Sequence, residues 1–432
     1  TISNKINIHS VIDVLIISYQ SLPMDVVSSY RTQAYLDYFY KYGVRPTLIT
    51  HRWEVEQNGA WKYHQDNEEV LKIENPSHTI FRLPRPRSQK PKNKFLSKLH
   101  TAWHLLVGNI DIELIQSYKV FKKFLFNHLN ENTYDAVLAI YHPHYGLKLA
   151  YEIHQKFGLP YVLDFRDLWN NEIVTKRYWP SITQKMIDLT IRRHWRKWLK
   201  SSLYFSSTSQ LWNHYLADLS RQEGIIVRNG YENLFIAEAR EQKDGVFRLT
   251  YFGRIYREQN LQPIIEGINL FLARKPDAEF VVELIGIKSV VGFNGAHEFE
   301  KLIRKENLSI RPSMPKRELL AYCLEFSTMF ILPNFIEDNG QFKVKLYDYV
   351  ALGKPTLACP DNSSDSIAML KEVHGGFLAS TKEEVCEHIR SQYEVFKQLG
   401  YLPFRPAEEE LRKYSREYQV RIQAERLKQD VA

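Results

Sequence analysis

The residues whose types and spacing point most directly to chemistry lie in the stretch NFIEDNGQFKVKLYDYVALGKP, residues 334–355. A glycine-containing loop that leads into a helix exposes backbone N–H groups at the positive end of the helix dipole, which favours phosphate binding. Lys343 and Lys345 add positive charge, and Asp348 is placed to accept hydrogen bonds from ribose hydroxyls. The alternative is a surface ion pair between Lys345 and Asp348, worth about 0.2–0.5 kcal/mol.

A second basic group follows the apolar run that ends at Phe252, where the sequence reads GRIYREQN. Gly253 permits close approach of the backbone to a ligand, and the Arg254 guanidinium would stand at the mouth of a strand. An arginine and a lysine that converge from different strands neutralise the charge of a departing nucleoside diphosphate. Arg254 and Lys345 are therefore the predicted pair for a leaving diphosphate.

Polar residues also follow two apolar runs in the first half of the chain. His142 and His144 come just after one run, and one interpretation is that such a histidine caps the next helix. Asp164, Arg166 and Asp167 crowd the end of the other run, where three ionised groups cannot be buried without partners. One acid is expected to face a ligand while Arg166 pairs with the other. A purely structural network is the alternative.

The loop after the first apolar run leads to Ser28, Ser29 and Arg31 at the start of a predicted helix. These residues are candidates for binding an anionic acceptor or a donor phosphate. The alternative for Arg31 is an ordinary position on the helix surface.

The elements that must position these residues alternate between strands and helices, which predicts an α/β protein with parallel sheets. The turn Asn229–Gly230 is the predicted junction between domain 1–229 and domain 230–405, and a charged helix follows in 406–432. The segment 53–130 interrupts the alternation in the first domain, and we interpret it as an inserted recognition element. The predicted strands are 13–18, 46–50, 136–140, 161–165, 249–252, 280–285, 330–333 and 355–359; the predicted helices are 30–42, 100–107, 112–129, 146–157, 261–274, 343–352 and 408–428.

Length and composition limit the class of protein. A chain of 432 residues exceeds what one core usually serves, and 44% hydrophobic with 25% charged residues excludes global disorder. The three cysteines have no metal-ligand or CxxC spacing, which fits a reducing cytosol. No apolar run reaches the length of about 18 residues needed to span a membrane, and no signal peptide is recognisable at the N-terminus. We expect a cytoplasmic protein, soluble or peripherally bound to a membrane.

The net charge of +8 is concentrated in two basic runs, Arg82–Lys98 and Ile191–Lys200. Anionic lipid head groups, a pyrophosphate-bearing acceptor or nucleic acid would each explain such runs, and the alternative for either run is a solvated helix face.

Four segments, in this order along the chain, resemble retaining glycosyltransferases of the GT-B fold, with the closest likeness to the family 4 type, also called glycosyl transferases group 1. They are DFRDLW (164–169), VRNGYE (227–232), YFGRIYREQNLQPIIEGI (251–268) and LPNFIEDNGQFKVKLYDYVALGKPTLA (332–358). The resemblance implies two Rossmann-like, doubly wound domains that face a central cleft. It also implies an N-terminal acceptor domain, a C-terminal nucleotide-sugar domain and a final helix that returns to the first domain.

The resemblance also implies roles for individual residues. Arg254 and Lys345 would hold the diphosphate and Asp348 the ribose, while His142 would lie beside the transferred sugar. The predicted catalytic residues are Arg254, Lys345, His142 and Asp164. The predicted donor-binding residues are Gly253, Arg254, Tyr256, Glu337, Asn339, Gly340, Gln341, Phe342, Lys345 and Asp348. The predicted acceptor and loop residues are Ser29, Arg31, His144, Arg166 and Asp167.

This sequence departs from the family pattern at two places in the donor half. The second basic residue after GR is replaced by Gln259 or Asn260, so we expect Lys345 to take its place. The usual pair of glutamates eight residues apart is missing, because Asp348 stands for the second and Gly340 for the first. Glu337 or Asp338 is expected to supply that carboxylate.

The expected activity is transfer of a sugar from a nucleoside diphosphate sugar to a hydroxyl of a glycan or lipid-linked acceptor, as in polysaccharide biosynthesis, with retention at the anomeric carbon. No cofactor and no metal are expected, since basic side chains supply the charge. The expected partners are the nucleotide sugar, the acceptor and an anionic membrane, here the inner face of the plasma membrane, but not nucleic acid. Two alternatives remain: a catalytically silent GT-B binding protein and, lower, a nucleic-acid glucosyltransferase.

Overall fold

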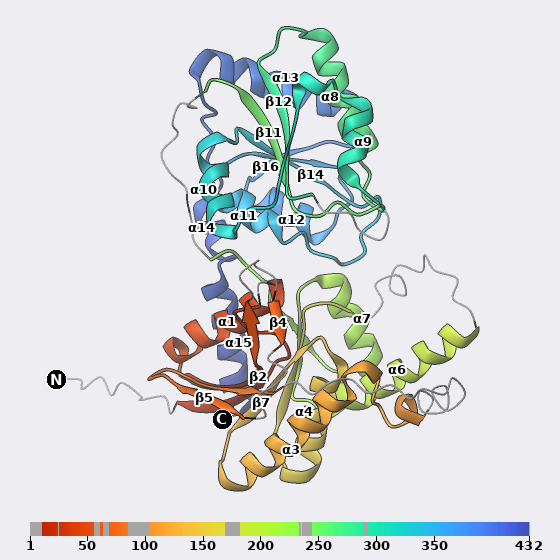
Figure 1. Ribbon diagram of the computed structural model, residues 1–432, viewed down its shortest axis with the longest axis vertical. Helices are drawn as coiled ribbons and strands as arrows, with labels where there is room; N and C mark the ends of the chain where they lie inside the picture. The colour runs from red at the N-terminus through yellow and green to blue at the C-terminus, as the bar shows by residue number, and fades with distance from the viewer. Residues whose placement is uncertain are drawn as a thin grey trace, which may run out of the picture. The chain divides into compact units, whose positions relative to one another are not determined.

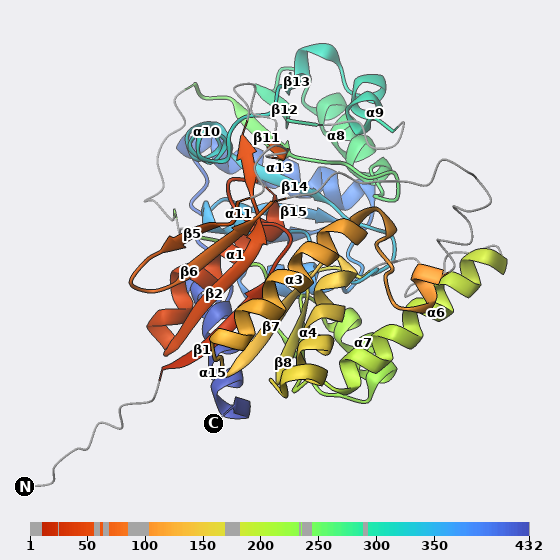
Figure 2. The same ribbon diagram turned by 60° about the horizontal axis from the view of Figure 1, so that its bottom comes forward.

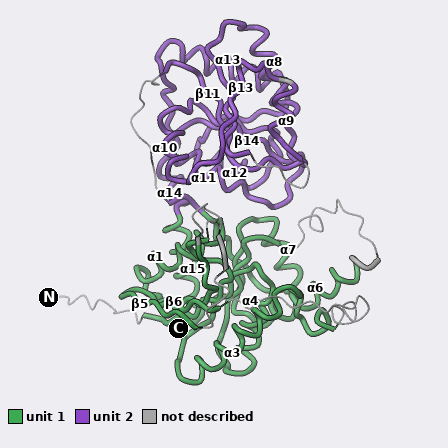
Figure 3. The backbone as a smooth tube through the Cα atoms, in the orientation of Figure 1, with its two compact units in different colours: residues 1–229, 416–432 green, residues 230–415 purple. Residues whose placement is uncertain are grey.

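The protein forms two compact units, each built around its own parallel sheet (Figure 3). The computed structural model describes residues 11–24, 26–55, 61–63, 69–84, 103–168, 182–232, 235, 244–287 and 293–431. Unit 1 contains Thr1–Asn229 and Arg416–Ala432, and unit 2 contains Gly230–Ser415. The first boundary falls at the turn that the sequence indicated, whereas unit 2 continues past residue 405 and the returning segment starts at Arg416.

Unit 1 is built on an eight-stranded sheet with the order β10-β9-β8-β7-β1-β2-β6-β5. The labels of β2, β5 and β7 locate this sheet in Figure 1. Neighbouring strands are parallel except that β5 runs antiparallel to β6. A separate antiparallel pair, β3 and β4, lies outside this sheet. The strands are β1 Ile12–Ile17, β2 Val44–His51, β3 Trp53–Val55, β4 Trp61–Tyr63, β5 Leu71–Glu74, β6 Thr79–Leu83, β7 Ala136–Tyr141, β8 Tyr161–Phe165, β9 Phe205–Ser207 and β10 Gly224–Ile226.

Helices cover both faces of this sheet because its strands are apolar on both sides. In β1, Leu15 and Ile17 face one hydrophobic cluster while Val14 and Ile16 face the other, as the period of two in a strand requires. The first cluster includes residues of α3, α4, α6 and α7, and the second includes residues of α1 and α15. The helices are α1 Val27–Tyr38, η1 Phe39–Tyr42, η2 Ile112–Leu114, α3 Ile115–Glu131, α4 His144–Phe157, α6 Ile182–Lys200, α7 Gln210–Ser220 and α15 Arg416–Val431.

Unit 2 repeats the plan with a six-stranded parallel sheet in the order β13-β12-β11-β14-β15-β16. Side chains of α8, α9 and α13 join the cluster on one face, and those of α10, α11, α12 and α14 join the cluster on the other. The strands are β11 Phe247–Phe252, β12 Phe280–Ile285, β13 Leu308–Arg311, β14 Met329–Pro333, β15 Thr356–Cys359 and β16 Gly376–Leu378. The helices are α8 Gln262–Arg274, α9 Gly295–Leu302, η3 Lys305–Asn307, α10 Lys316–Phe326, α11 Lys345–Ala351, α12 Asp365–Glu372, α13 Lys382–Leu399 and α14 Glu408–Arg412.

Part of the segment 53–130 is scaffold, which differs from its interpretation as an inserted recognition element. β6 pairs in parallel with β2 inside the main sheet, and α3 buries Phe121 and Leu125 in the first cluster of unit 1. A strand paired on both sides within a sheet and a helix on the face of that sheet are structural positions. Residues 56–60, 64–68 and 85–102 lie outside the described residues, and with them most of the basic run Arg82–Lys98.

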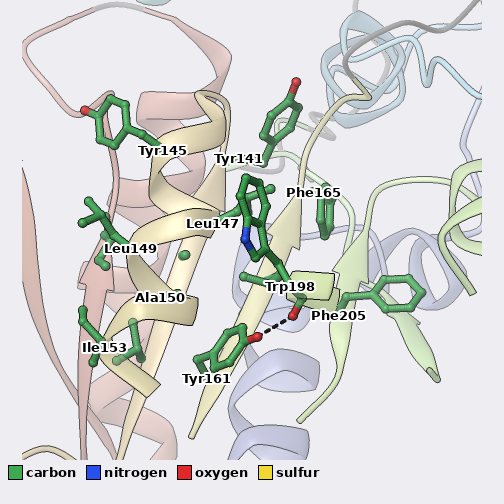
Figure 4. Packing of buried hydrophobic residues seen from close by; sticks show 14 of the residues in the cluster. Tyr141, Tyr145, Leu147, Leu149, Ala150, Ile153, Tyr161, Phe165, Trp198 and Phe205 are labelled. Carbon is green, nitrogen blue, oxygen red and sulfur yellow. Dashed lines mark hydrogen bonds between the residues drawn. The ribbon is translucent and has the colours of Figure 1, made fainter. Parts of the chain in front are cut away.

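The aromatic half of the run Ile191–Lys200 belongs to the core of unit 1. Trp195 and Trp198 on α6 are buried, and Trp195 lies against Phe165. The Tyr161 hydroxyl donates a hydrogen bond to the backbone carbonyl of Trp198 (Figure 4). The indole rings therefore stabilise the helix against the sheet. Among the described helices, none combines the length and the apolar character required to cross a bilayer.

Candidate functional site

Each sheet has one point where the strand order reverses, and the predicted site residues follow the strands at these points. In unit 1 the chain winds outward from β1 through β2 in one direction and from β7 through β8 in the other. In unit 2 the corresponding neighbours are β11 and β14. Ligands of open α/β sheets bind outside the carboxyl ends of the strands at such points. The loops after β7, β11 and β14 therefore have the right topology for a binding site.

The loop after β11 brings Arg254 and Lys345 together, as the sequence predicted. Gly253 has a φ of +87°, and a Cβ atom at this glycine would lie 3.5 Å from the Lys345 ammonium nitrogen. Lys345 donates a hydrogen bond to the Arg254 carbonyl at 3.1 Å and another to the Tyr251 hydroxyl. The Arg254 side chain is exposed and has no partner among the described residues. A cation is thus fixed beside the turn, and a second cation next to it is free to bind an anion.

The Lys345 ammonium is held in surroundings that disfavour its charge. Its nitrogen lies 3.8 Å from the centroid of the Tyr251 ring, and no carboxylate pairs with it among the described residues. Burial therefore lowers the pKa of Lys345 to about 7. An anionic ligand next to this amine would raise its pKa again, so ligand binding and protonation of Lys345 favour each other.

The loop between β14 and α11 is closed by its own side chains. Asp338 accepts a hydrogen bond from the Gly340 N–H at 2.8 Å, and Asn339 accepts one from the Gln341 N–H at 3.0 Å. Gly340 has a φ of +76°, which fits glycine at this turn. The Gly340 and Gln341 N–H groups are therefore engaged within the loop, and α11 itself begins only at Lys345.

The other predicted donor-binding residues lie around the same two loops. Asp348, expected at the ribose, forms an ion pair with Lys316 at 2.6 Å. Glu337 is exposed on the loop, and the Asp338 pKa is raised by burial. Phe342 stacks on Tyr347 with ring centroids 4.6 Å apart. A ribose would have to share the Asp348 carboxylate with Lys316, a partner that the sequence did not indicate.

Gln259, which stands where the family pattern has a basic residue, connects the two loops. Its amide nitrogen donates to the Pro333 carbonyl at 2.5 Å, and its amide oxygen accepts from the Tyr256 N–H at 2.7 Å. The Asn260 N–H donates to the Asn334 carbonyl at 3.0 Å. A lysine at position 259 could not make both side-chain hydrogen bonds, because it has no acceptor.

In unit 1, His142 and His144 meet at the end of β7 together with Asp111, which sequence reasoning missed. Asp111 accepts the Tyr145 N–H at 3.0 Å and lies 3.0 Å from His144 Nδ1, so it caps the first turn of α4. His144 is buried and His142 is half exposed, with its Nε2 atom 3.9 Å from Asp111. Asp111 was missed because it comes from the segment 53–130, which matched no known pattern.

Asp111, His142 and His144 also have the residue types of a metal site. One ligand atom from each lies within 4.8 Å of the other two. Two histidines and a carboxylate suit Zn²⁺. Both Asp111 oxygens and one nitrogen of His144 already have hydrogen-bond partners in the bonds just described, so these atoms do not require an ion as a partner. The absence of a metal requirement therefore stays a prediction.

Asp164, predicted to be catalytic, is fully buried and paired with Arg31. Arg31 binds both carboxylate oxygens, at 2.7 and 2.6 Å, and Tyr35 and Ser206 donate to the same oxygens at 3.0 and 2.7 Å. The exposed fraction is 0% for Asp164 and 4% for Arg31. Neither side chain faces solvent, so this is a structural network joining α1, β8 and β9. A catalytic role for Asp164 stays a prediction.

The remaining candidates of unit 1 lie close to this network. Arg166 pairs with Asp167 at 2.6 Å, as the sequence indicated, and burial raises the Asp167 pKa. Ser29 is buried, and its hydroxyl has no hydrogen-bond partner in the described part of the chain. Arg31 is not a surface residue of the helix, and its role in binding an anion stays a prediction.

Comparisons with known proteins identify the fold. No family model matches the sequence, and no curated protein matches it. The sucrose-phosphate synthase of Thermosynechococcus elongatus matches with a TM-score of 0.61 at 14% identity, over 96% of this chain and 98% of that chain. An E. coli trehalose-6-phosphate structure bound with UDP-2-fluoro glucose matches with a TM-score of 0.60 at 11% identity, over 96% and 99%. The chain has the GT-B fold.

A third similar structure is an alpha,alpha-trehalose-phosphate synthase (UDP-forming) from Burkholderia xenovorans in complex with glucose-6-phosphate. Its TM-score is 0.57 at 9% identity, and the match covers 97% of this chain and 99% of that chain. At such identities the likeness concerns the fold alone. The GT-B architecture with two doubly wound units was therefore predicted correctly from the sequence.

Proposed function

We propose that this protein is a glycosyltransferase that moves a sugar from a nucleoside diphosphate sugar to an acceptor hydroxyl, with retention at the anomeric carbon. The observation that carries the proposal is the position of Lys345 next to Gly253, at the point where the strand order of unit 2 reverses. The Lys345 ammonium donates a hydrogen bond to the Arg254 carbonyl there. Similar folds in the comparisons include a structure with UDP-2-fluoro glucose bound. Two cations at this point suit a diphosphate.

In the proposed mechanism, the acceptor oxygen attacks the anomeric carbon on the face from which the diphosphate departs. The bond from the anomeric carbon to the phosphate oxygen breaks, and both of its electrons leave with the nucleoside diphosphate. The acceptor proton moves to an oxygen of that diphosphate. Arg254 and Lys345 stabilise the negative charge that develops there. No nucleophilic carboxylate is needed, which fits the engagement of Asp164 with Arg31.

The test begins with thermal shifts against UDP, GDP, ADP and CDP sugars, followed by turnover of the donor that binds. We expect Arg254→Ala and Lys345→Ala each to lower donor turnover by about 10²–10³, the range for one lost charge-stabilising donor. The matched control is Lys397→Ala, which removes an ammonium that pairs with Glu279. Glu279 immediately precedes β12, so this pair lies at the amino ends of the strands, away from the loops that follow β11 and β14. Turnover near the wild-type level in both site variants would contradict the assignment.

The proposed chemistry needs no metal, because Arg254 and Lys345 supply the positive charge. Donor turnover should therefore persist after dialysis against EDTA, because protein side chains supply the charge stabilisation. A loss of activity that Zn²⁺ or Mg²⁺ restores would contradict this. Replacement of His142 by Ala would then show whether the group at Asp111 is responsible.

We propose further that the acceptor is a glycan or lipid-linked hydroxyl presented at an anionic membrane, as in family 4 enzymes of polysaccharide synthesis. The supporting feature is a stripe of exposed residues on α6, which projects from the rest of unit 1 (Figure 2). Its members fall on one face of the helix: Lys185, Met186, Leu189, Arg193, Arg196, Lys197 and Lys200. A face that combines basic and apolar side chains is typical of helices that lie in a membrane interface.

A second apolar group adjoins this stripe. His194 of α6 hydrogen-bonds the Leu105 carbonyl at 3.0 Å, which fixes residues 103–107 against the helix. Trp103 and Leu106 in this segment are 63% and 68% exposed, close to the values of Met186 and Leu189. Large apolar side chains are seldom exposed together without a partner surface.

Sedimentation with liposomes tests the membrane part of the proposal. Binding to vesicles with anionic lipid should exceed binding to neutral vesicles and should fall at high salt, since each basic residue contributes about 1 kcal/mol near such a surface. Met186→Ser with Leu189→Ser should weaken binding at low salt, while Lys397→Ala should not. Equal recovery on neutral and anionic vesicles would contradict it, and efficient transfer to glucose-6-phosphate alone would favour a soluble acceptor.

A further inference from the structure

Lys343 is a buried lysine to which the proposed mechanism gives no role. It lies in the loop between β14 and α11, two residues before Lys345, and only 6% of it is exposed. Its ammonium nitrogen is inaccessible to solvent and has no hydrogen-bond partner in the described part of the chain. A buried charged group without such partners is costly, and most native proteins satisfy or neutralise it. The structure therefore leaves this side chain without a structural explanation.

The surroundings of Lys343 favour the uncharged amine. Its nitrogen lies 3.2 Å from the centroid of the Phe335 ring and 6.0 Å from that of Tyr256. Burial lowers the pKa of Lys343 well below its usual value, and the charge of Lys345 acts in the same direction. Glu258 and Asp338 act in the opposite direction and more weakly. An aromatic contact alone does not compensate a fully buried ammonium.

The backbone around Lys343 places it beside the predicted diphosphate position. Residues Gln259 and Phe335 form an antiparallel bridge that joins the loop after β11 to the loop after β14. Lys345 extends from the second loop to the carbonyl of Arg254 in the first. The Lys343 N–H donates to Ser366 at 2.9 Å, which anchors the base of its side chain. Only the ammonium end is therefore free to change its environment.

We propose that Lys343 is a third cation of the donor site, and that its amine takes up a proton and pairs with the diphosphate when a nucleotide binds. This inference rests on the proposed function of the same site. Two negatively charged phosphates supply the partner that the free protein lacks. The proton comes from the solvent, and no bond is made or broken. The protonated form is the one that binds, so affinity should fall as pH rises above the pKa values of the free amines, which burial has lowered.

Calorimetry with UDP, GDP, ADP and CDP tests this on the protein of 432 residues. At pH 8, titrations in HEPES and in Tris, two buffers of different ionisation enthalpy, give the number of protons taken up with the nucleotide that binds most tightly. We expect Lys343→Met to reduce proton uptake and to weaken binding by about tenfold, a typical loss for one charge-assisted hydrogen bond. We assign the proton uptake that remains in Lys343→Met to Lys345. Lys397→Met should leave affinity and proton uptake unchanged.

The outcomes separate this inference from the proposed function. Lys343→Met should melt at or above the wild-type temperature, because methionine fills the space without burying an amine; Lys343→Gln serves as a second variant in case it does not fold. If wild type binds a nucleotide and both variants match its affinity and proton uptake, the inference is overturned and the proposed function stands. If wild type binds none of the four nucleotides, both are overturned.

Discussion

At the scale of single residues, the molecule separates cations that hold the fold from cations that are free to act. Arg31 belongs to the first kind, since Asp164 takes its guanidinium in a buried two-oxygen contact. Arg254 belongs to the second kind, being exposed without a partner among the described residues. Sequence patterns alone cannot make this distinction, because both arginines follow small or polar residues at the start of a loop or helix.

The burial of Asp164 predicts a large effect on stability. Asp164→Ala would leave Arg31 buried and unpaired, and we expect a loss of about 3–5 kcal/mol in the free energy of unfolding. The matched control is Asp13→Ala, which breaks the ion pair with Arg45; that arginine is 54% exposed. An exposed pair contributes at most about 1 kcal/mol.

Tryptophan fluorescence is suited to this measurement because all 8 tryptophans of the chain lie before residue 230, within unit 1. Urea unfolding followed by this signal reports on unit 1 alone. Similar losses in the two variants would show that Asp164 and Arg31 are not a buried pair in solution.

At the scale of elements, the sequence predicted the strands that carry the site more accurately than the segments between them. Tyr161–Phe165 and Phe280–Ile285 were predicted with the observed bounds, because buried parallel strands are continuous apolar runs between turn residues. The predicted helix 408–428 is broken into α14 and α15. The sheet strand β6 was missed because its short run, TIFRL, contains an arginine and adjoins a proline-rich stretch.

In the candidate site, too, residues that follow predictable strands could be predicted, whereas contacts between distant segments could not. Gly253, Arg254 and Lys345 could be predicted because they follow recognisable strands in a recognisable order. The bonds of Asp348 to Lys316 and of His144 to Asp111 join elements far apart in sequence, so no local pattern reveals them.

The packing of α8 against α13 predicts that one glycine cannot be replaced. A Cβ atom at Gly267 would lie 2.5 Å from a methyl carbon of Val385 and 2.8 Å from the Lys382 carbonyl oxygen. Gly267→Ala should therefore destabilise unit 2 by about 1–3 kcal/mol, although alanine is the better helix former. Differential scanning calorimetry measures the change.

Gly146 in α4 provides the control. A Cβ atom there would meet the Ile140 carbonyl oxygen at 3.6 Å, an ordinary contact. Gly146→Ala should be neutral or stabilising by up to about 1 kcal/mol. A Gly267→Ala protein as stable as Gly146→Ala would show that α8 and α13 are less tightly packed than the structure indicates.

At the scale of the whole molecule, unit 1 is completed by the last segment of the chain. On α15, Val420, Ala424 and Leu427 are buried in the second cluster of unit 1. Gln423 donates to the Tyr204 hydroxyl at 3.0 Å, and Gln419 accepts the Arg228 N–H at 2.6 Å. The helix therefore provides both apolar contacts and hydrogen bonds to residues that precede unit 2.

Deletion of residues 416–432 should destabilise unit 1 and spare unit 2. The burial of Val420 and that of Leu427 each contribute about 1.5–3 kcal/mol to the free energy of unfolding, and the deletion removes both contributions. The tryptophan signal should unfold at lower urea, while amide hydrogen exchange in β11 and β12 stays unchanged. A chain that ends at Leu427 is the control and should keep most of the stability. An unaltered tryptophan transition after the full deletion would contradict this prediction.

The return of α15 to unit 1 also sets an order for folding during synthesis. Unit 2 is one continuous stretch, so all of it has been translated when the ribosome reaches residue 415. Unit 1 still lacks the helix that covers one face of its sheet at that moment. Nascent chains usually fold from the N-terminal domain onward. Here the second unit can reach its final state first, and the first must wait with an open apolar face until its closing helix leaves the exit tunnel.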